Sequence, residues 1–315
     1  MGTTTDRNPG SRADPLAATN SRQTSRTGRR GFGAHRRMGS RWGDTVILAA
    51  MPEGHTIHRL AQDLVATLGS APGAATVQAT SPQGRFADGA SLLDGDRLIS
   101  AEAFGKYLFC HFGGALLHVH LGLIGKFRPN PPDVPGGDTV RLRLENDRIA
   151  WHLTGPARCE LVTPDEASAI VAGLGADPLR PRTRPTSLHR LLARTAKPIG
   201  ATLLDQQVVA GIGNVYRAEI LFLRGIHPER PSSSLSADEI DGIWSEAKRL
   251  LRRGVRLNRI VTTSPAEIGR PLARIDGDDR LYVYHRTNCR RCGSELGTLE
   301  IGGRPIQFCP SCQPA

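Results

Sequence analysis

Four cysteines near the C-terminus constrain the fold more than any other feature of this 315-residue sequence. They occur as two pairs with the spacing C-x2-C-x16-C-x2-C, at Cys289, Cys292, Cys309 and Cys312. This spacing is typical of a tetrahedral structural zinc site, in which each pair of thiolates comes from a tight turn. Disulfides are the alternative, but they need an oxidising compartment, which no feature of the sequence indicates. We therefore predict one structural Zn²⁺ per chain.

The segment between the two cysteine pairs predicts a β-hairpin. It reads LEIGGRPIQF, which is a strand, a turn at Gly302-Gly303 and a second strand. A metal bound by the cysteines would clamp this hairpin and present Arg304 at its tip. Taken alone, Arg304 is equally compatible with an ordinary solvated turn residue.

The charge of the chain favours a polyanionic partner, because Lys and Arg that neutralise phosphates release condensed counterions. Lys and Arg number 41 against 30 Asp and Glu, which gives a formal net charge of +11. Residues 1–50 contribute +6 of this charge and contain few large apolar residues, so we predict that they are disordered. GRRGFG in this segment faintly resembles a twin-arginine export motif but is followed by no apolar region.

The pattern of apolar residues predicts two domains ahead of the cysteines. Apolar residues at helical spacing predict a helix over residues 53–68, and short β-rich pieces over residues 76–161 predict a mostly antiparallel β-sandwich. LLDQQVVAGIGNVYRAEILF predicts two helices broken at Gly211 to Asn214, and a capping box at Ser236 and Glu239 predicts a further helix.

The predicted fold class is therefore a multi-domain α+β protein. We expect a β-sandwich catalytic domain, a Pro- and Arg-rich hinge, a helical domain and a zinc finger, over residues 51–165, 166–187, 188–280 and 281–315.

Four motifs in order resemble the Fpg/Nei family of DNA glycosylases: MPEGHTIHRL, AEAFGKYLFCHF, DQQVVAGIGNVYRAEILF with GIHP, and GGRPIQFCPSCQ. The resemblance spans residues 51–315 and is closest to the endonuclease VIII (Nei) branch, because Pro-Glu-Gly follows Met51. It implies a β-sandwich, a helix-two-turns-helix domain and a zinc finger, with damaged double- or single-stranded DNA between the lobes. It also implies a bifunctional glycosylase and AP lyase that acts as a monomer, in the cytoplasm at the nucleoid.

The resemblance implies four catalytic residues. Pro52 matches the N-terminal nucleophile, and Glu53 matches the neighbouring acid/base carboxylate, although by pattern alone Glu53 is a residue favoured by the helix dipole. Lys106 matches a second catalytic lysine assigned to β-elimination and phosphate contact, and would otherwise be a solvent-exposed strand residue. Arg304 matches the hairpin arginine that grips the phosphate beside the lesion and assists δ-elimination.

The resemblance also implies residues that bind DNA. Asn214 matches the helix-two-turns-helix asparagine that binds a backbone phosphate, a role compatible with a turn residue. The loop HLGLIGKF aligns with the loop that fills the space of an extruded base, so Leu123 and Ile124 are candidate wedges, with Lys126 beside them. The better-known Nei pattern has Gln-Leu-Tyr here, which leaves the preference for the opposite base open.

The position of Pro52 raises a difficulty, because a proline inside a chain has no free amine. We therefore expect the functional start to be Met51, whose removal would expose the Pro52 nitrogen. The predicted activity is excision of oxidised bases, pyrimidines preferred, followed by β,δ-elimination. The alternatives are an 8-oxoguanine or formamidopyrimidine glycosylase, and a catalytically silent DNA-binding repair protein if Pro52 is never N-terminal.

Overall fold

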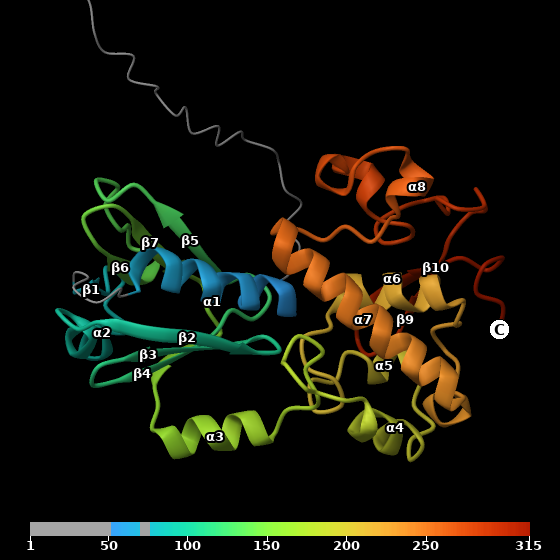
Figure 1. The fold of residues 1–315 in the computed structure, drawn as a ribbon, viewed down its shortest axis with the longest axis horizontal. Helices are drawn as coiled ribbons and strands as arrows, with labels where there is room; N and C mark the ends of the chain where they lie inside the picture. The colour runs from blue at the N-terminus through green and yellow to red at the C-terminus, as the bar shows by residue number, and fades with distance from the viewer. Residues whose placement is uncertain (1–51, 70–75) are drawn as a thin grey trace, which may run out of the picture. The chain divides into compact units, whose positions relative to one another are not determined.

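The computed structural model describes residues 52–69 and 76–315 of the chain (Figure 1). The predictions for residues 1–50, and the expected start at Met51, lie outside the described residues. Among the described helices, none is both long and apolar enough to cross a lipid bilayer.

The first part of the described chain is the predicted antiparallel β-sandwich. It begins with α1 (Gly54–Leu68) and includes the short helix α2 (Ala87–Leu93). One sheet contains, in spatial order, β1 (Gln78–Thr80), β6 (Val140–Glu145), β7 (Ala150–Thr154) and β5 (Lys126–Asn130). The other contains β2 (Leu98–Phe104), β3 (Tyr107–Phe112), β4 (Leu116–His120) and β8 (Arg158–Leu161).

A single apolar core joins α1 to both sheets. Ile57, Leu60 and Leu64 recur on one face of α1 and are buried, because residues three and four apart lie on the same side of a helix. This face packs against β2 and β3. Strand β6 alternates buried and half-buried residues, as expected of a strand with one face in the core.

The second part of the described chain is helical. It contains α3 (Pro164–Ala172), α4 (Thr186–Leu192), α5 (Ile199–Thr202), α6 (Asn214–Arg224), a 3₁₀ turn (Ser232–Ser234) and α7 (Ala237–Leu257). The predicted capping box at the start of α7 is present, with Ser236 accepting from the Glu239 N–H and the Glu239 carboxylate accepting in return.

Several local elements differ from those predicted. The helix expected before Gly211 is only the single turn α5, and residues 203–213 form a loop. The side chain of Gln206 stabilises this loop, because it donates to the carbonyls of Leu204 and Ile212 and accepts from the Gly211 N–H. Helices α2 and α3 and strand β5 were not predicted, and the proposed hinge over residues 166–187 contains most of α3.

The last part carries α8 (Pro265–Ile268), two 3₁₀ turns (Leu272–Arg274 and Gly277–Arg280) and a hairpin of β9 (Gly297–Glu300) and β10 (Pro305–Phe308). Gly302 and Gly303 adopt φ values of 66° and 68°, which confirms the predicted glycine turn. Ile301 and Ile306 share one buried core with α6 and α7, so the hairpin packs on the helical part. The fold is mixed α+β, as predicted.

Candidate functional site

Glu53 joins α1, the first helix of the described residues, to a helix that starts 161 residues after Glu53 in the sequence. It precedes α1, and its side chain is fully buried. Oε2 accepts a hydrogen bond of 2.7 Å from the Gly213 N–H, and Oε1 accepts one of 2.8 Å from the Val215 N–H. The first N–H groups of a helix have no partner within it, so the Glu53 carboxylate caps the N-terminus of α6. The half-buried Pro52 immediately precedes Glu53 in the chain.

Three glycines allow three backbone segments to meet beside Glu53. The Gly54 N–H donates to the Gly211 carbonyl at 2.8 Å, and a Cβ on Gly54 would lie 2.7 Å from the Gly211 Cα. A Cβ on Gly105 would lie 2.7 Å from the Ala210 Cβ. Gly105 also has φ 58°. Side chains at these positions would separate α1, the turn that carries Lys106 and the loop before α6.

Charged groups from three parts of the chain influence each other at this junction. Burial raises the pKa of Glu53, and the Lys106 charge opposes that rise. Burial likewise lowers the pKa of the half-buried Lys106, while Glu53 raises it and Arg304 lowers it. Lys106 is therefore within electrostatic reach of both Glu53 and Arg304.

Asp177 holds the Lys106 turn in place and was missed by the sequence analysis. This buried carboxylate accepts from the Gly105 N–H at 2.7 Å and hydrogen-bonds His58 Nε2 on α1 at 2.8 Å. It also accepts from the Leu179 N–H. Asp177 lies in the predicted Pro- and Arg-rich hinge, and the sequence carried no signal of this contact.

His120 is a second residue that the sequence analysis missed. Its Nδ1 lies 3.0 Å from the Lys106 carbonyl oxygen, and its ring stacks on Tyr107 with centroids 4.6 Å apart. Burial lowers the pKa of His120, and the charge of Lys106 lowers it further. The alternation His-Val-His in a strand puts His118 and His120 on one face, which is a signal that sequence analysis could have used.

Arg217 attaches the hairpin to α6. Its side chain is fully buried and donates to Asn214 Oδ1 at 2.8 Å and to the carbonyls of Ile301 and Arg304 at 2.8 and 3.0 Å. The Asn214 amide donates to the Pro305 carbonyl at 3.1 Å. Asn214, predicted to bind phosphate, is thus buried and bonded to the hairpin, and its side chain also hydrogen-bonds Tyr284. Arg304 is half-buried at the hairpin turn.

The predicted wedge residues lie on the connection between β4 and β5. Leu123 is 55% exposed and Ile124 is 78% exposed, and the exposed Lys126 begins β5. The neighbouring Leu121 is buried in the sandwich core and fixes the base of this loop. Two adjacent large apolar residues that remain in solvent are unusual and are typical of a contact surface.

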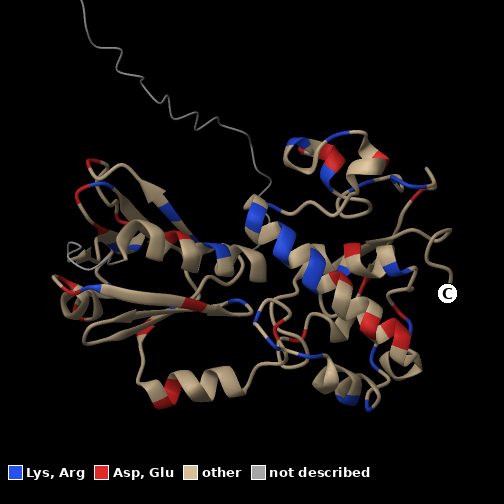
Figure 2. Cartoon of the chain, viewed as in Figure 1, with Lys and Arg blue, Asp and Glu red and all other residues tan. Residues whose placement is uncertain are grey.

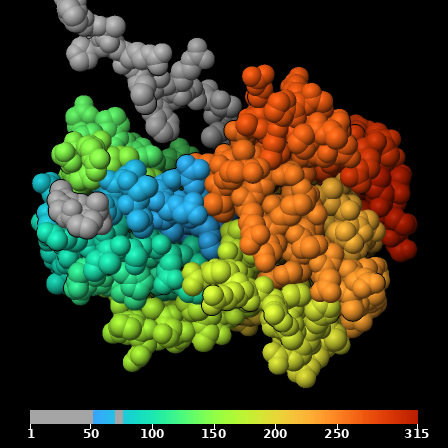
Figure 3. All heavy atoms as spheres, viewed as in Figure 1, coloured from blue at the N-terminus to red at the C-terminus, as the bar shows by residue number. Residues whose placement is uncertain are grey.

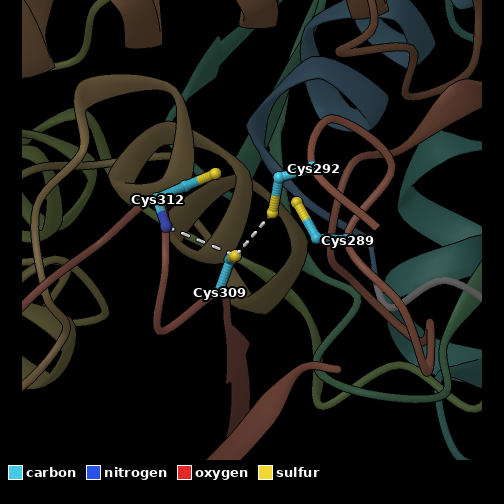
Figure 4. A group of neighbouring side chains, drawn as sticks. All are labelled: Cys289, Cys292, Cys309 and Cys312. Carbon is cyan, nitrogen blue, oxygen red and sulfur yellow. Dashed lines mark hydrogen bonds between the residues drawn. The ribbon is translucent and has the colours of Figure 1, made fainter. Parts of the chain in front are cut away.

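The four cysteines form a cluster that fits a metal ion. Figure 4 shows the side chains of Cys289 and Cys292 facing those of Cys309 and Cys312. Their four sulfur atoms lie within 4.8 Å of one another, and the Sγ atoms of Cys292 and Cys309 are 3.4 Å apart. Tetrahedral metal–sulfur bonds of about 2.3 Å place sulfurs about 3.8 Å apart, so the cluster has the size of a four-coordinate structural metal site.

Comparisons with known protein families match both the β-sandwich part and the helical part of the chain. The sequence model of the formamidopyrimidine-DNA glycosylase N-terminal domain matches residues 51–159, and that of the formamidopyrimidine-DNA glycosylase H2TH domain matches residues 174–265. A protein named Endonuclease 8 1 from Mycobacterium tuberculosis is 41% identical over 271 residues, which covers 84% of this chain and 100% of the relative.

More distant relatives agree with this match. A formamidopyrimidine-DNA glycosylase from Exiguobacterium sp. is 32% identical over 230 residues, covering 70% of this chain and 83% of the relative. The crystal structure of Lactococcus lactis Fpg (MutM) in complex with DNA containing N7-benzyl-Fapy-dG matches with a TM-score of 0.69 at 24% identity. It covers 84% of this chain and 100% of that one.

Proposed function

We propose that this chain, which belongs to the Fpg/Nei family of DNA glycosylases, excises oxidised bases from DNA and then cleaves the abasic strand. Its similarity to a protein named Endonuclease 8 1 over that protein's whole length supports the endonuclease VIII activity, with oxidised pyrimidines preferred. The single observation that carries the proposal is the burial of Glu53 at the α6 N-terminus, with the charge of Lys106 acting on its carboxylate.

Pro52 is the proposed nucleophile. Once Met51 is removed, Pro52 carries an α-amino group whose pKa of roughly 8 leaves an appreciable neutral fraction at pH 7. Its nitrogen bonds to C1′ as the glycosidic bond breaks, and the base departs with the bonding electrons and a proton. The sugar ring then opens as O4′ takes a proton, and the nitrogen lone pair forms the C1′ iminium.

Glu53 is the proposed proton donor for ring opening. A carboxylic acid can donate only while it is protonated, and the raised pKa of Glu53 keeps the acid form available at a higher pH. The hydrogen bonds from Gly213 and Val215 fix the orientation of the carboxyl group next to Pro52. A residue placed in this way needs no rearrangement of the backbone before it transfers its proton.

Lys106 and Arg304 are proposed to act in strand cleavage. The iminium acidifies the C2′ proton, and loss of that proton expels the 3′ phosphate in the β-elimination. A second proton loss then expels the 5′ phosphate in the δ-elimination. A lowered pKa suits Lys106 to accept a proton, and the guanidinium of Arg304 suits the departing phosphate.

The remaining candidate residues are proposed to hold the DNA. Leu123 and Ile124 fill the space that the extruded base leaves, and Lys126 contacts a nearby phosphate. Asn214, the predicted phosphate-binding residue, contributes through the hairpin that it anchors. We propose that the four cysteines bind Zn²⁺, which supplies no step of the chemistry and keeps the hairpin folded.

The substrate preference is tested by excision assays on duplexes that contain 5-hydroxycytosine, thymine glycol or 8-oxoguanine. We expect the two oxidised pyrimidines to be removed faster. A clear preference for 8-oxoguanine would instead support the alternative, an 8-oxoguanine or formamidopyrimidine glycosylase.

A further inference from the structure

The outer face of α7 carries a row of cations that the proposed chemistry does not use. The inner face packs in the core through residues such as Ile243, Leu250 and Gly254. Positions four residues apart share one side of a helix, and here the solvent-facing side of the C-terminal half is basic. Figure 2 shows this basic half, and Figure 3 shows α7 at the molecular surface. The cations are Lys248, Arg249, Arg252, Arg253 and Arg256.

Helix stability alone does not explain this row. Acidic residues begin α7 and basic residues end it, which complements the helix dipole, but that effect fades beyond the last turn. Lys248 and Arg252 lie more than one turn before the end. Within residues 52–69 and 76–315, the side chains of Lys248, Arg252 and Arg256 make no hydrogen bond or ion pair. Three cations therefore remain available to an external anion.

The row lines a groove instead of standing on a flat surface. Leu272, in the 3₁₀ turn after α8, forms part of the opposite wall, and the groove encloses about 610 Å³. Arg259, just after the end of α7, fixes that segment, because it donates to the carbonyls of Ala273 and Ile275. The groove is thus built from two elements that are fixed to each other.

The groove lies near the proposed active site without sharing a residue with it. On the inner face of α7, Gly254 packs against His55, which follows Glu53 by two residues, and a Cβ there would lie 2.9 Å from the His55 Cβ. Arg59 on α1 donates to the Val255 carbonyl at 3.4 Å. The C-terminal end of the cation row therefore sits against the first two turns of α1.

We propose that this groove binds the sugar–phosphate backbone of the DNA that flanks the lesion, outside the cleft. The inference rests on the proposed function, because it requires that duplex DNA is the substrate. Lys248, Arg252 and Arg256 follow one another in steps of about 6 Å over about 12 Å of helix. Phosphates of one strand advance about 3.4 Å each along the duplex axis, so the row spans three to four phosphates.

A sugar–phosphate strand fits the observations better than an acidic protein segment. The cations are spaced regularly along one straight helix, which suits a polymer with a regular charge repeat. Among the residues that line the groove, Leu272 is the single large apolar side chain, whereas a peptide site normally offers pockets for apolar anchors.

The test compares two lengths of duplex that contain the same central abasic analogue. If the inference holds, a duplex of about 30 base pairs reaches the groove and one of about 10 base pairs does not. The full chain is compared with the double variant Arg252→Glu/Arg256→Glu. The matched control is Arg85→Glu/Arg190→Glu, which makes the same charge change at exposed residues of other elements. Thermal unfolding of each protein verifies that the fold is retained.

We expect the α7 variant to lose about tenfold in affinity for the long duplex, and its salt slope to fall by about two units. The control variant Arg85→Glu/Arg190→Glu should keep the wild-type affinity for the long duplex and the wild-type salt slope. An α7 variant that binds the long duplex with the wild-type affinity and slope would overturn the inference. Binding of a labelled octaglutamate peptide that is lost in the α7 variant, with unchanged duplex binding, would instead assign the groove to an acidic protein segment.

Failure of the proposed function gives a different result. In that case the unaltered chain would bind neither abasic duplex more tightly than undamaged DNA of the same length.

Discussion

The Glu53 carboxylate accepts a hydrogen bond of 2.8 Å from the backbone N–H of Val215, across 162 residues of sequence. Glu53 precedes α1 and Val215 lies in the first turn of α6, so this bond joins the β-sandwich part to the helical part. The proposed proton donor is therefore positioned by a helix of the other lobe. Any change that moves the α6 N-terminus will also move the acid.

Replacement of Glu53 by Gln should change how stability depends on pH. Burial raises the pKa of Glu53 above its usual 4.5, so the folded state binds this proton more tightly than the unfolded state does. The stabilisation that this tighter proton binding gives the folded state is complete below about pH 4.5. It is lost as the pH rises through the raised pKa of Glu53. As the pH rises through this range, we expect the free energy of unfolding of Glu53→Gln to increase relative to that of the unaltered protein. Urea unfolding at several pH values measures this, and a constant difference would contradict it.

Replacement of Arg217 by Lys should destabilise the hairpin although the charge is kept. A lysine ammonium carries three N–H groups, too few for the Asn214 oxygen and the carbonyls of Gly200, Ile301 and Arg304. Buried acceptors without partners cost about 1–3 kcal/mol each, so we expect a loss of about 3 kcal/mol in urea unfolding. The control Arg148→Lys, at a residue with a 75% exposed side chain, should stay within about 0.5 kcal/mol. Equal stability of the Arg217→Lys and Arg148→Lys variants would show that Arg217 does not stabilise the hairpin through these hydrogen bonds.

Replacement of Cys309 by Ser should remove the bound metal. Metal analysis should find one zinc ion per unaltered chain and none per variant chain. Without the metal the hairpin loses its clamp, and we expect strand cleavage to fall at least about tenfold while the β-sandwich stays folded. Cys159→Ser, a change outside the cluster, should retain zinc. Zinc-free wild-type protein with full activity would argue against the metal site.

Replacement of Leu123 and Ile124 by Ala should reduce base excision without loss of stability. Both side chains are largely exposed, so their removal costs the folded state little. If they fill the space of the extruded base, excision should slow by about tenfold, whereas cleavage of a ready-made abasic site should change less. Ile99→Ala, which removes another exposed isoleucine from β2, is the control. Unchanged excision by the double variant would show that other residues act as the wedge.

Local sequence patterns predicted the elements that depend on local interactions. The helix that begins after Glu53, the capping box at Ser236 and the turn at Gly302-Gly303 each have a signal within a few residues. The cysteine spacing predicted a cluster that the structure forms. The loop over residues 203–213 was misjudged as helix, because its stability comes from the side chain of Gln206, which no periodicity reveals.

Long-range contacts at the candidate site could not be predicted from the sequence. The contact of Asp177 with Gly105 joins positions 72 residues apart, and nothing near Asp177 marks it. The contacts of Arg217 with the hairpin could not be predicted either, because the sequence of α6 does not show whether this side chain faces the core or the solvent. The family resemblance pointed to Glu53 and Lys106 as one site, but only the fold revealed that Glu53 caps α6.

The central claim is that the Pro52 amine attacks the sugar, and borohydride trapping on abasic DNA tests it most directly. Borohydride reduces an iminium to a stable amine, so it links the enzyme covalently to DNA only if that intermediate forms. A chain that starts at Met51, with the methionine trimmed, should be trapped at Pro52, as peptide mass analysis of the adduct will show. The intact 315-residue chain should not be trapped. Equal trapping of both proteins, or an adduct on Lys106, would contradict the account.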